Sequence, residues 1–341
     1  MYKGAIVGCG SVACQAHIPA WHQAPACEIV AVVDPEPARL AQARALLPAA
    51  RCYRHLDALL AEEKLDFLDV CTPPAMHKPV ILQACAHGVH VLCEKPLTVS
   101  AQALRQIITA AVTAGVLVFP VHNWKYAPLF QALKRLLEDG EIGHPTYVEL
   151  TTLRTGPAGT NGWRLDSSIA GGGILMDHGW HAFYLLLFLL GERPEAIAAR
   201  VERRLLPAAA VEDTATCDVF FPHARAHIHL TWAAQQRRNQ GVIRGEQGEV
   251  RLEDTRLVVR RHAQEQREIH LPAALSAGSY HPDWFASLLP DFQAALQEPW
   301  RYSASLQEAE TCLRLILLAY RSAALNTQSL PYTQAFNLEV V

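Results

Sequence analysis

The N-terminal segment constrains the fold of this chain more than any other part of it. A short apolar run at residues 5–7 leads into the sequence GCGSVA at residues 8–13, which matches the pattern G-x-G-x-x-A. Gly8 permits a tight turn after a strand, Gly10 lets a phosphate group approach the backbone, and Ala13 is small enough for a helix to pack against the strand. This pattern predicts that a pyrophosphate binds at the N-terminus of the next helix, with contacts from Gly8, Gly10, Ser11, Val12 and Ala13.

Asp34 supports this interpretation because it ends the second apolar run, about 20 residues after the glycines, where a dinucleotide-binding domain places an acidic residue. Without that context a glycine-rich turn is a weak signal, since glycines also occur in turns by chance. The Asp34 carboxylate would accept hydrogen bonds from both adenosine ribose hydroxyls and repel a 2′-phosphate. A neighbouring arginine would reverse the preference, but Pro35 and Glu36 follow instead. We therefore expect NAD as the preferred cofactor, with NADP as the alternative.

Length and composition indicate a compact two-domain protein. At 341 residues the chain exceeds what one hydrophobic core usually fills, and 50% of its residues are hydrophobic while 18% are charged. The formal net charge of -3 gives no electrostatic reason to bind nucleic acid or an anionic membrane. The nine cysteines are scattered and no secretory signal precedes the first strand, so we expect reduced thiols in the cytoplasm. The most apolar run, residues 183–190, is too short to span a bilayer and predicts a buried helix.

The first third of the chain alternates short apolar runs with helical stretches, which is typical of a parallel sheet wrapped by helices. Strands are expected at residues 3–7, 28–34, 67–72, 90–93 and 117–121. Helices are expected at residues 38–47, 77–87 and 101–114, which are long enough for right-handed crossovers. The pattern predicts the α/β class, with a Rossmann domain built on a doubly wound parallel sheet.

After Asn123 the pattern changes to that of an α+β domain with a large, open-faced, mostly antiparallel sheet. Expected strands lie at residues 146–154, 196–206, 214–221, 226–232, 241–244, 249–252 and 256–260, and several alternate polar and apolar residues. Expected helices lie at residues 129–138, 283–296 and 306–325. We predict an NAD(P)-binding domain at 1–122 and a substrate-binding and oligomerisation domain at 123–341, whose last helices can pack back on the first domain.

Two loops in the first domain carry further candidate residues. The segments CTPPAMH (71–77) and CEKPLT (93–98) both follow predicted strands, and the carboxyl ends of parallel strands are where such sheets bind ligands. A loop lysine is more often a solvated surface charge, but two adjacent strands that end in similar clusters favour a cofactor crevice. The candidate cofactor-binding residues in these loops are Thr72, Pro73, His77, Glu94 and Lys95.

The segment GGGILMDHGWH (171–181) is the strongest candidate for catalysis in the second domain. Asp177 and His181 are four residues apart, so an α-helix would place them on one face, where the carboxylate can orient the imidazole for acid–base work. The glycines at 171–173 are expected to form a flexible lead-in. A buried histidine that only packs is the alternative, and His178 is as well explained by packing as by substrate contact. No metal site is expected, because successive residues point apart on a helix.

Together these segments resemble the glucose–fructose oxidoreductase/inositol dehydrogenase family (Gfo/Idh/MocA) over nearly the whole chain, including the closing segment EAETCLRLILLAYRSA. The resemblance implies a Rossmann domain followed by an α/β substrate domain. It implies that Lys95 lies by the nicotinamide and the substrate hydroxyl, that Asp177 contacts the substrate, and that His181 is the acid–base group. It also implies that His77 lies near the nicotinamide and that the protein forms dimers or tetramers through the second sheet.

Two departures from the family pattern concern the substrate side. Where many members have Asn-x-Arg-Phe, this chain has Asn123-Trp124-Lys125-Tyr126, and Tyr184 stands where an aspartate usually follows the histidine by three residues. Both changes leave the hydride chemistry in place and put the identity of the substrate in doubt. Trp163 and Arg164 resemble a loop that reaches over the pocket in the family. For each of them, packing and substrate contact are equally good interpretations. The candidate substrate-binding residues are Asn123, Lys125, Tyr126, Trp163, Arg164 and His178.

The leading hypothesis is an NAD(P)-dependent dehydrogenase that transfers hydride between the nicotinamide and a secondary alcohol or ketone of a sugar, sugar derivative or cyclitol. Lys95, Asp177 and His181 would supply the acid–base chemistry. One alternative is a regulatory or sensor protein that binds NAD in the same fold without turnover. Another keeps the cofactor bound and uses it in alternating or transient oxidation. Retention of all three catalytic candidates favours the enzyme over the sensor.

Overall fold

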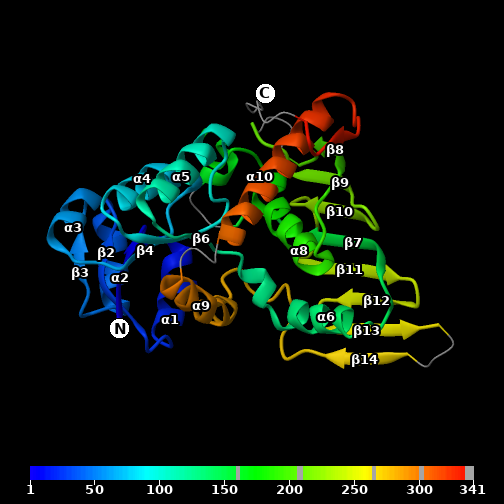
Figure 1. Ribbon diagram of the computed structural model, residues 1–341, viewed down its shortest axis with the longest axis horizontal. Coiled ribbons are helices and arrows are strands. Elements are labelled where there is room, and N and C mark those ends of the chain that lie inside the picture. Colours follow the sequence, from blue (N-terminus) through cyan, green and yellow to red (C-terminus); the bar gives the residue numbers. More distant parts are fainter. Residues whose placement is uncertain (159–161, 206–209, 263–265, 299–302, 335–341) are drawn as a thin grey trace. The chain divides into compact units, whose positions relative to one another are not determined.

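The protein is described by a computed structural model, which covers all residues except 159–161, 206–209, 263–265, 299–302 and 335–341 (Figure 1). The chain divides into two compact units. Unit 1 comprises residues 1–123 and 280–310, and unit 2 comprises residues 124–279 and 311–341.

Unit 1 is built on a six-stranded sheet in the order β3-β2-β1-β4-β5-β6. Its strands are β1 (Tyr2–Val7), β2 (Cys27–Val33), β3 (Arg51–Tyr53), β4 (Phe67–Val70), β5 (His90–Cys93) and β6 (Val118–Pro120). Every pairing in it is parallel. The strand order reverses between β1 and β4, which is the switch point where doubly wound sheets bind ligands. The predicted Rossmann fold is confirmed.

The helices of unit 1 lie between its strands and in the returning segment after residue 280. They are α1 (Ile18–Trp21), α2 (Pro37–Leu46), α3 (Leu56–Glu62), α4 (His77–Ala86), α5 (Ala101–Ala114) and α9 (Pro282–Gln297), with a π-helical turn η1 (Ala13–His17) and a 3-10 turn η2 (Pro74–Met76). Helix α5 shows how its sequence fixes its limits. The Ser100 side chain accepts a hydrogen bond from the Ala103 amide at the N-cap, and Gly115 ends the helix at φ 64.

Unit 2 is built on a nine-stranded sheet in the order β14-β13-β12-β11-β7-β10-β9-β8-β15. Its strands are β7 (Pro145–Leu153), β8 (Ala196–Glu202), β9 (Thr214–Phe220), β10 (Arg225–Thr231), β11 (Arg238–Gly245), β12 (Gly248–Glu253), β13 (Arg256–Arg261), β14 (Arg267–His270) and β15 (Leu330–Pro331). Strands β7 and β10 pair in parallel and the other pairings are antiparallel. The predicted mostly antiparallel sheet is confirmed, although the expected strand at 196–206 ends at Glu202 and residue 206 lies outside the described residues.

The nine-stranded sheet has one face covered by helices and one open face. The helices are α6 (Pro128–Glu138), η5 (Leu175–Gly179), α8 (Trp180–Leu190) and the later part of α10 (Ser303–Ala324), which lie along one side of the sheet in Figure 1. Strand β7 shows the alternation, since Val148, Leu150 and Thr152 are buried while the residues between them are partly exposed. None of the large apolar side chains that are exposed among the described residues lies on the open face, so this face is more polar than the alternation predicted.

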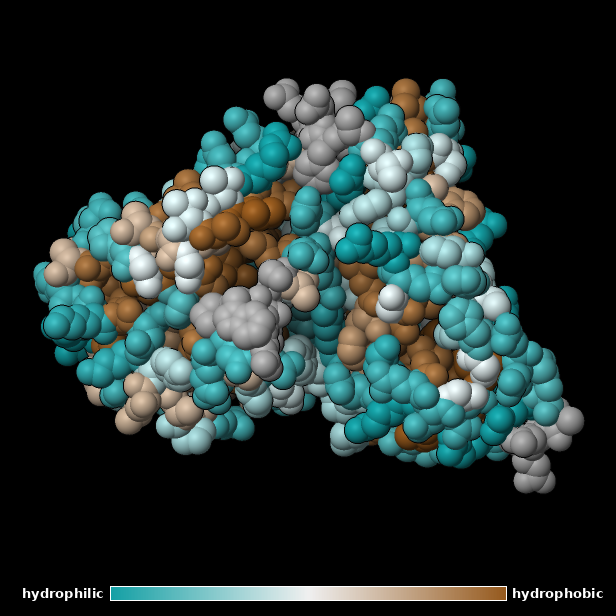
Figure 2. All heavy atoms as spheres, viewed as in Figure 1, coloured by the Kyte–Doolittle hydropathy of each residue, from teal (hydrophilic) through white to brown (hydrophobic). Residues whose placement is uncertain are grey.

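Short and edge elements were the ones that the sequence did not predict. Strands β3, β14 and β15 have two to four residues each, too few to show a period. Figure 2 shows that hydrophilic side chains predominate at the end of the sheet formed by β12–β14, where β14 is the edge strand, which suits an exposed edge that must not pair with other sheets.

One helical stretch, Ser167–Leu190, is long and apolar enough to cross a membrane by length and composition. This stretch is longer than the apolar run at residues 183–190 that the sequence indicated. Of the apolar window within it, 78% is buried inside the protein. This burial is typical of a core helix.

Candidate functional site

The glycine-rich turn after β1 has the geometry that a bound dinucleotide requires. Gly8 has φ 93, and a Cβ there would lie 2.9 Å from both the Cγ2 and the amide of Thr72. A Cβ at Gly10 would meet nothing within 4 Å, so a ligand can approach this backbone directly. Ala13 is fully buried against the core, as expected from its small size.

The helical segment that follows this turn differs from the prediction in its winding. It begins at Ser11, which is exposed, and Val12, which is partly exposed. The next turn, Ala13–His17, is a π-helix rather than an α-helix. This winding brings His17 into the core, where it is 1% exposed.

Asp34 is held rigidly at the end of β2. Its Oδ2 accepts a hydrogen bond from the Cys9 amide at 2.9 Å, and its Oδ1 accepts one from the Glu36 amide at 2.9 Å. The side chain is 2% exposed. Arg39 Nη1 lies 3.8 Å from Asp34 Oδ2, which the sequence analysis missed because the arginine comes one turn into α2. A cation therefore does stand beside the residue expected to read the ribose.

The loops after β4 and β5 are joined by His77. Its Nδ1 lies 2.9 Å from the Pro96 carbonyl oxygen and its Nε2 lies 2.7 Å from the Thr72 carbonyl oxygen. Burial lowers the pKa of His77, which the two carbonyls oppose. The peptide bond between Lys95 and Pro96 is cis. His77 thus ties together the two loops that carry the predicted cofactor residues, and Pro73 is the N-cap residue of the short turn η2 in the first of them.

A buried charge network fixes the backbone next to Lys95. Glu94 Oε2 accepts a hydrogen bond from the Lys95 amide at 3.0 Å, and Glu94 Oε1 lies 3.1 Å from His17 Nε2. The other nitrogen of His17 lies 2.9 Å from Asp69 Oδ1. Burial opposes a charge on His17, but Asp69 and Cys71 raise its pKa well above the ordinary value. Burial likewise raises the pKa of Glu94, but His17 and Lys95 outweigh it and lower the pKa.

In unit 2, His181 is held from two sides. It is 7% exposed, its Nδ1 lies 2.6 Å from the Tyr184 hydroxyl oxygen, and its ring stacks on Trp124 with centroids 4.8 Å apart. The Tyr184 hydroxyl oxygen also accepts a hydrogen bond from the Trp124 amide at 3.1 Å. Tyr184 is fully buried. The phenol at this position therefore connects the imidazole to the backbone that precedes α6.

Asp177 and its neighbours lie in a π-helical turn, so the α-helical geometry assumed from their spacing is wrong over residues 175–179. Asp177 Oδ2 lies 3.5 Å from Arg164 Nε and 3.5 Å from His178 Nδ1. The rings of His178 and His181 have centroids 6.1 Å apart. Unit 2 thus brings the predicted residues Arg164, Asp177, His178 and His181 into one neighbourhood.

The remaining substrate candidates lie in the short segments that flank this neighbourhood. Arg164 packs over the ring of Trp163, with its Cζ 4.2 Å from the ring centroid, and Lys125 Nζ lies 5.9 Å from the Tyr184 centroid. Asn123 and Tyr126 begin and end the 3-10 turn η3 (Asn123–Tyr126). Lys95 belongs to unit 1, whereas Asp177 and His181 belong to unit 2, so their meeting at one site stays a prediction.

The glycines before Asp177 are tightly packed rather than flexible, which corrects the sequence interpretation. A Cβ at Gly172 would collide with the Tyr320 hydroxyl, and one at Gly173 would collide with the Glu212 backbone. The Glu212 carboxylate accepts hydrogen bonds from the Gly173 and Leu175 amides at 3.0 and 2.9 Å and from the Tyr320 hydroxyl at 2.8 Å. This buried carboxylate fixes the start of the helix that carries Asp177 and His181.

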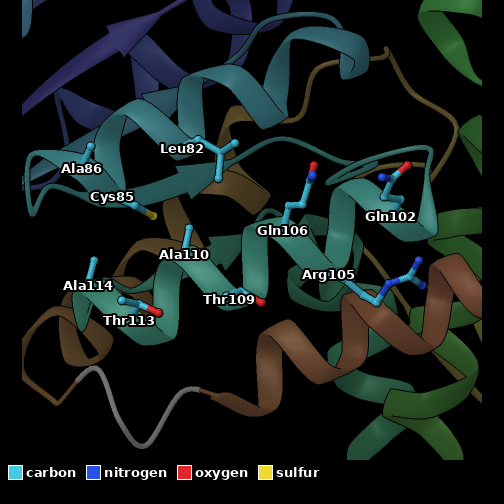
Figure 3. Close-up of a pocket in the computed structure, with 10 residues that line it drawn as sticks. All are labelled: Leu82, Cys85, Ala86, Gln102, Arg105, Gln106, Thr109, Ala110, Thr113 and Ala114. Carbon is cyan, nitrogen blue, oxygen red and sulfur yellow. The ribbon is translucent and has the colours of Figure 1, made fainter.

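Two groups of three potential metal ligands occur among the described residues. They are His17, Asp69 and Cys71 in unit 1, and His144, Glu192 and His223 in unit 2. Neither group contains Asp177, His178 or His181. A groove between α4 and α5 is lined by side chains of both helices, among them Cys85, Gln106 and Thr109 (Figure 3). None of the predicted site residues lines that groove.

Comparisons with known proteins cover both units. Residues 2–122 match the family model of an oxidoreductase family with an NAD-binding Rossmann fold, and residues 130–251 match the model of the GFO/IDH/MocA C-terminal domain. A D-apiose dehydrogenase of Paraburkholderia graminis is 35% identical over 144 residues, which cover 42% of this chain and 38% of the relative. A D-apiose dehydrogenase of Rhizobium rhizogenes is 30% identical over 221 residues, which cover 63% of this chain and 61% of the relative. The matched region thus spans less than two thirds of either relative.

Among solved structures, GenD2 from gentamicin A biosynthesis, crystallised with NAD, is 26% identical with a TM-score of 0.83. The match covers 97% of this chain and 96% of that chain. The fold similarity therefore extends over both units.

Proposed function

This chain belongs to the Gfo/Idh/MocA family of oxidoreductases, and we propose that it transfers a hydride between NAD and a secondary alcohol or ketone of a sugar, sugar derivative or cyclitol. The observation that carries the proposal is the His181 site, in which a nearly buried imidazole is held by Tyr184 and Trp124 beside Asp177 and His178. A buried histidine that only packs would also need a hydrogen-bond partner, so the proposal rests on this imidazole lying in one neighbourhood with Arg164, Asp177 and His178. The relatives named as D-apiose dehydrogenases act on a sugar, which agrees with the proposed substrate class.

The residues of unit 1 fit a bound dinucleotide. The open backbone at Gly10 can receive a pyrophosphate, and the Thr72 hydroxyl is buried with no hydrogen-bond partner among the described residues. Asp34 presents a carboxylate to the ribose. When bound, the nicotinamide supplies the carbon that accepts or donates the hydride. Residues 1–122 would hold the cofactor and residues 123–341 would supply the substrate-binding groups.

The proton chemistry follows from the contacts of His181. Because Nδ1 is engaged by Tyr184, the substrate proton goes to Nε2. Neutral His181 then carries its hydrogen on Nδ1 and donates it to the Tyr184 oxygen, whose second lone pair accepts the Trp124 amide hydrogen. Lys95 stabilises the oxygen that becomes negative as the proton leaves, and Asp177 contacts a substrate hydroxyl. The reverse reaction uses the same groups.

Two further parts of the proposal concern location and assembly. All nine cysteines are free thiols, which supports a reducing cytoplasm. A homodimer or homotetramer formed through the nine-stranded sheet is also proposed; it rests on the resemblance to the family, because none of the exposed large apolar side chains among the described residues lies on the open face.

The test of the proposed function is steady-state kinetics of His181→Ala at saturating NAD. A screen of polyols, inositols, aldoses and sugar nucleotides with NAD and NADP first identifies a substrate. Loss of general acid–base catalysis should then lower turnover by roughly 100- to 10,000-fold while NAD affinity stays nearly unchanged. His144→Ala, at a half-exposed histidine of the same unit, is the matched control and should behave as wild type. Near wild-type turnover by folded His181→Ala would refute the mechanism.

A further inference from the structure

Three neighbouring strands of the nine-stranded sheet end in buried polar side chains on its helix-covered face. Strand β7 lies between β10 and β11, and its last residue Leu153 pairs with Thr231 on one side and with Arg238 on the other. Trp232 directly follows β10, Arg154 directly follows β7, and Asn239 is the second residue of β11. These side chains are 1%, 4% and 2% exposed. The backbone brackets Trp232, because the Arg154 amide donates to the Thr231 oxygen and the Ala234 amide donates to the Arg154 oxygen.

Arg154 is a buried cation whose hydrogen-bond partners are all neutral. Nη1 donates to the Leu153 and Arg238 carbonyl oxygens at 2.8 and 3.4 Å, and Nη2 donates to Asn239 Oδ1 at 3.1 Å. A guanidinium has five N–H donors, so these three hydrogen bonds leave N–H donors of Arg154 available for a ligand. Within the described part of the chain, no carboxylate forms an ion pair with Arg154. A buried charge without a counter-ion is costly, so a bound anion at Arg154 would relieve this cost.

The groups next to Arg154 offer further donors. Asn239 Nδ2 and Trp232 Nε1 are buried and have no hydrogen-bond partner among the described residues. Both atoms can only donate. Burial, with a smaller contribution from Arg237, lowers the pKa of Arg154 to about 10, although Asp177 and Asp254 act in the opposite direction. The guanidinium is therefore charged at neutral pH, and the cluster offers a cation and two donors with oxygen acceptors missing.

This cluster shares a wall with the candidate catalytic histidine. The Arg154 Cζ lies 5.8 Å from the centroid of the Trp124 ring, and the same ring stacks on His181. Arg154 and His181 therefore both lie against the ring of Trp124.

We propose that the substrate carries an anionic oxygen group, a carboxylate or a phosphate, that binds Arg154 with help from Asn239 and Trp232 while a secondary hydroxyl faces His181. This proposal rests on the proposed dehydrogenase function and narrows its substrate class to sugar acids or sugar phosphates. A planar guanidinium suits both groups, because each presents two oxygens to its paired N–H donors.

The kinetic test compares matched substrates in wild type, Arg154→Gln and Arg154→Lys. Neutral aldoses and cyclitols, the corresponding uronic acids, and their phosphate monoesters form three arms, and the two charged arms distinguish carboxylate from phosphate. Hydrogen bonds to charged groups are worth about 1.5–3 kcal/mol, so Arg154→Gln should lower kcat/KM for the preferred anionic arm by roughly 10- to 100-fold. The neutral arm should change little. Arg154→Lys keeps the positive charge but loses the paired N–H donors of the guanidinium, so its kcat/KM for the anionic arm should lie between those of wild type and Arg154→Gln. Arg238→Gln, at the adjacent exposed arginine, is the matched control.

A binding readout separates this proposal from the proposed function. Thermal shifts with uronate and with a sugar phosphate, each in the presence of NAD, report anion binding whether or not turnover occurs. A shift in wild type and Arg238→Gln that is lost in Arg154→Gln supports the anion site even if no hydride transfer is found. Equal shifts for neutral and charged sugars, or equal loss of kcat/KM in all three arms of Arg154→Gln, would overturn it.

Discussion

Tyr184→Phe is the sharpest perturbation of the candidate catalytic site, because it removes one oxygen atom and leaves the ring in place. The Tyr184 oxygen lies 2.6 Å from His181 Nδ1 and 3.1 Å from the Trp124 nitrogen. The substitution leaves the Trp124 amide and the imidazole without these contacts in a fully buried environment. An unsatisfied buried polar group costs about 1–3 kcal/mol. At roughly 2–4 °C per kcal/mol for a domain of 150–250 residues, the melting temperature should fall by several degrees.

The kinetic consequence separates a positioning role from a purely structural one. Without its hydroxyl partner the His181 ring loses the contact that selects its tautomer, so kcat at saturating NAD should fall by roughly 10- to 100-fold, less than for loss of the histidine itself. The KM for NAD should not move, because unit 1 carries the residues expected to bind it. Tyr147→Phe is the matched control, since that hydroxyl contacts Glu149 away from His181. If folded Tyr184→Phe keeps wild-type kcat, the reasoning about His181 is refuted.

Three further predictions concern the cofactor, the buried charges and the assembly. Fluorescence titration should show tighter binding of NADH than NADPH, and Asp34→Ser should reverse the order because Arg39 stays beside the ribose; equal affinities in wild type would contradict this. His17→Gln should lower the thermal stability most at about pH 5–6.5. A histidine whose pKa is raised in the folded protein stabilises the fold fully below its unfolded pKa of about 6.5, and this stabilisation is lost as the pH rises through the folded pKa. The lowered pKa of Glu94 keeps its carboxylate charged in the acid part of this range. The exposed His22→Gln serves as control, and a pH-independent difference would exclude the charge argument. Light scattering at micromolar concentration should give a dimer or tetramer, and a monomer would count against association through the sheet.

The parts of the fold that the sequence predicted are those written in local patterns. The G-x-G-x-x-A turn and the strand before it are contiguous, so Gly8, Gly10 and Asp34 could be placed without knowing any distant contact. The spacing of Asp177 and His181 likewise identified the candidate acid–base pair. Its geometry was wrong, because a π-helical turn is not distinguishable from an α-helix by apolar periodicity.

The residues that the sequence missed belong to contacts between distant segments. His17 meets Asp69 and Glu94 across 52 and 77 positions, and Arg154 meets Asn239 across 85. The only local signal for such contacts is a charge within an apolar strand, as at Asp69, which is 0% exposed and must be compensated by a partner elsewhere. A buried charge such as Asp69 indicates that a compensating partner exists, but the sequence does not identify which residue it is.

The phenol at position 184 and the buried cation at position 154 are explained by one electrostatic argument. The family pattern favours an aspartate where this chain has Tyr184, and an aspartate there would add a negative charge against His181 and the backbone of Trp124. Trp124 also packs near Arg154, so that carboxylate would add a negative charge close to the proposed anion site and disfavour an anionic group there. Tyr184 preserves a hydrogen-bond partner for the imidazole without adding the charge. Tyr184 in place of the aspartate therefore favours a substrate that is a sugar acid or a sugar phosphate.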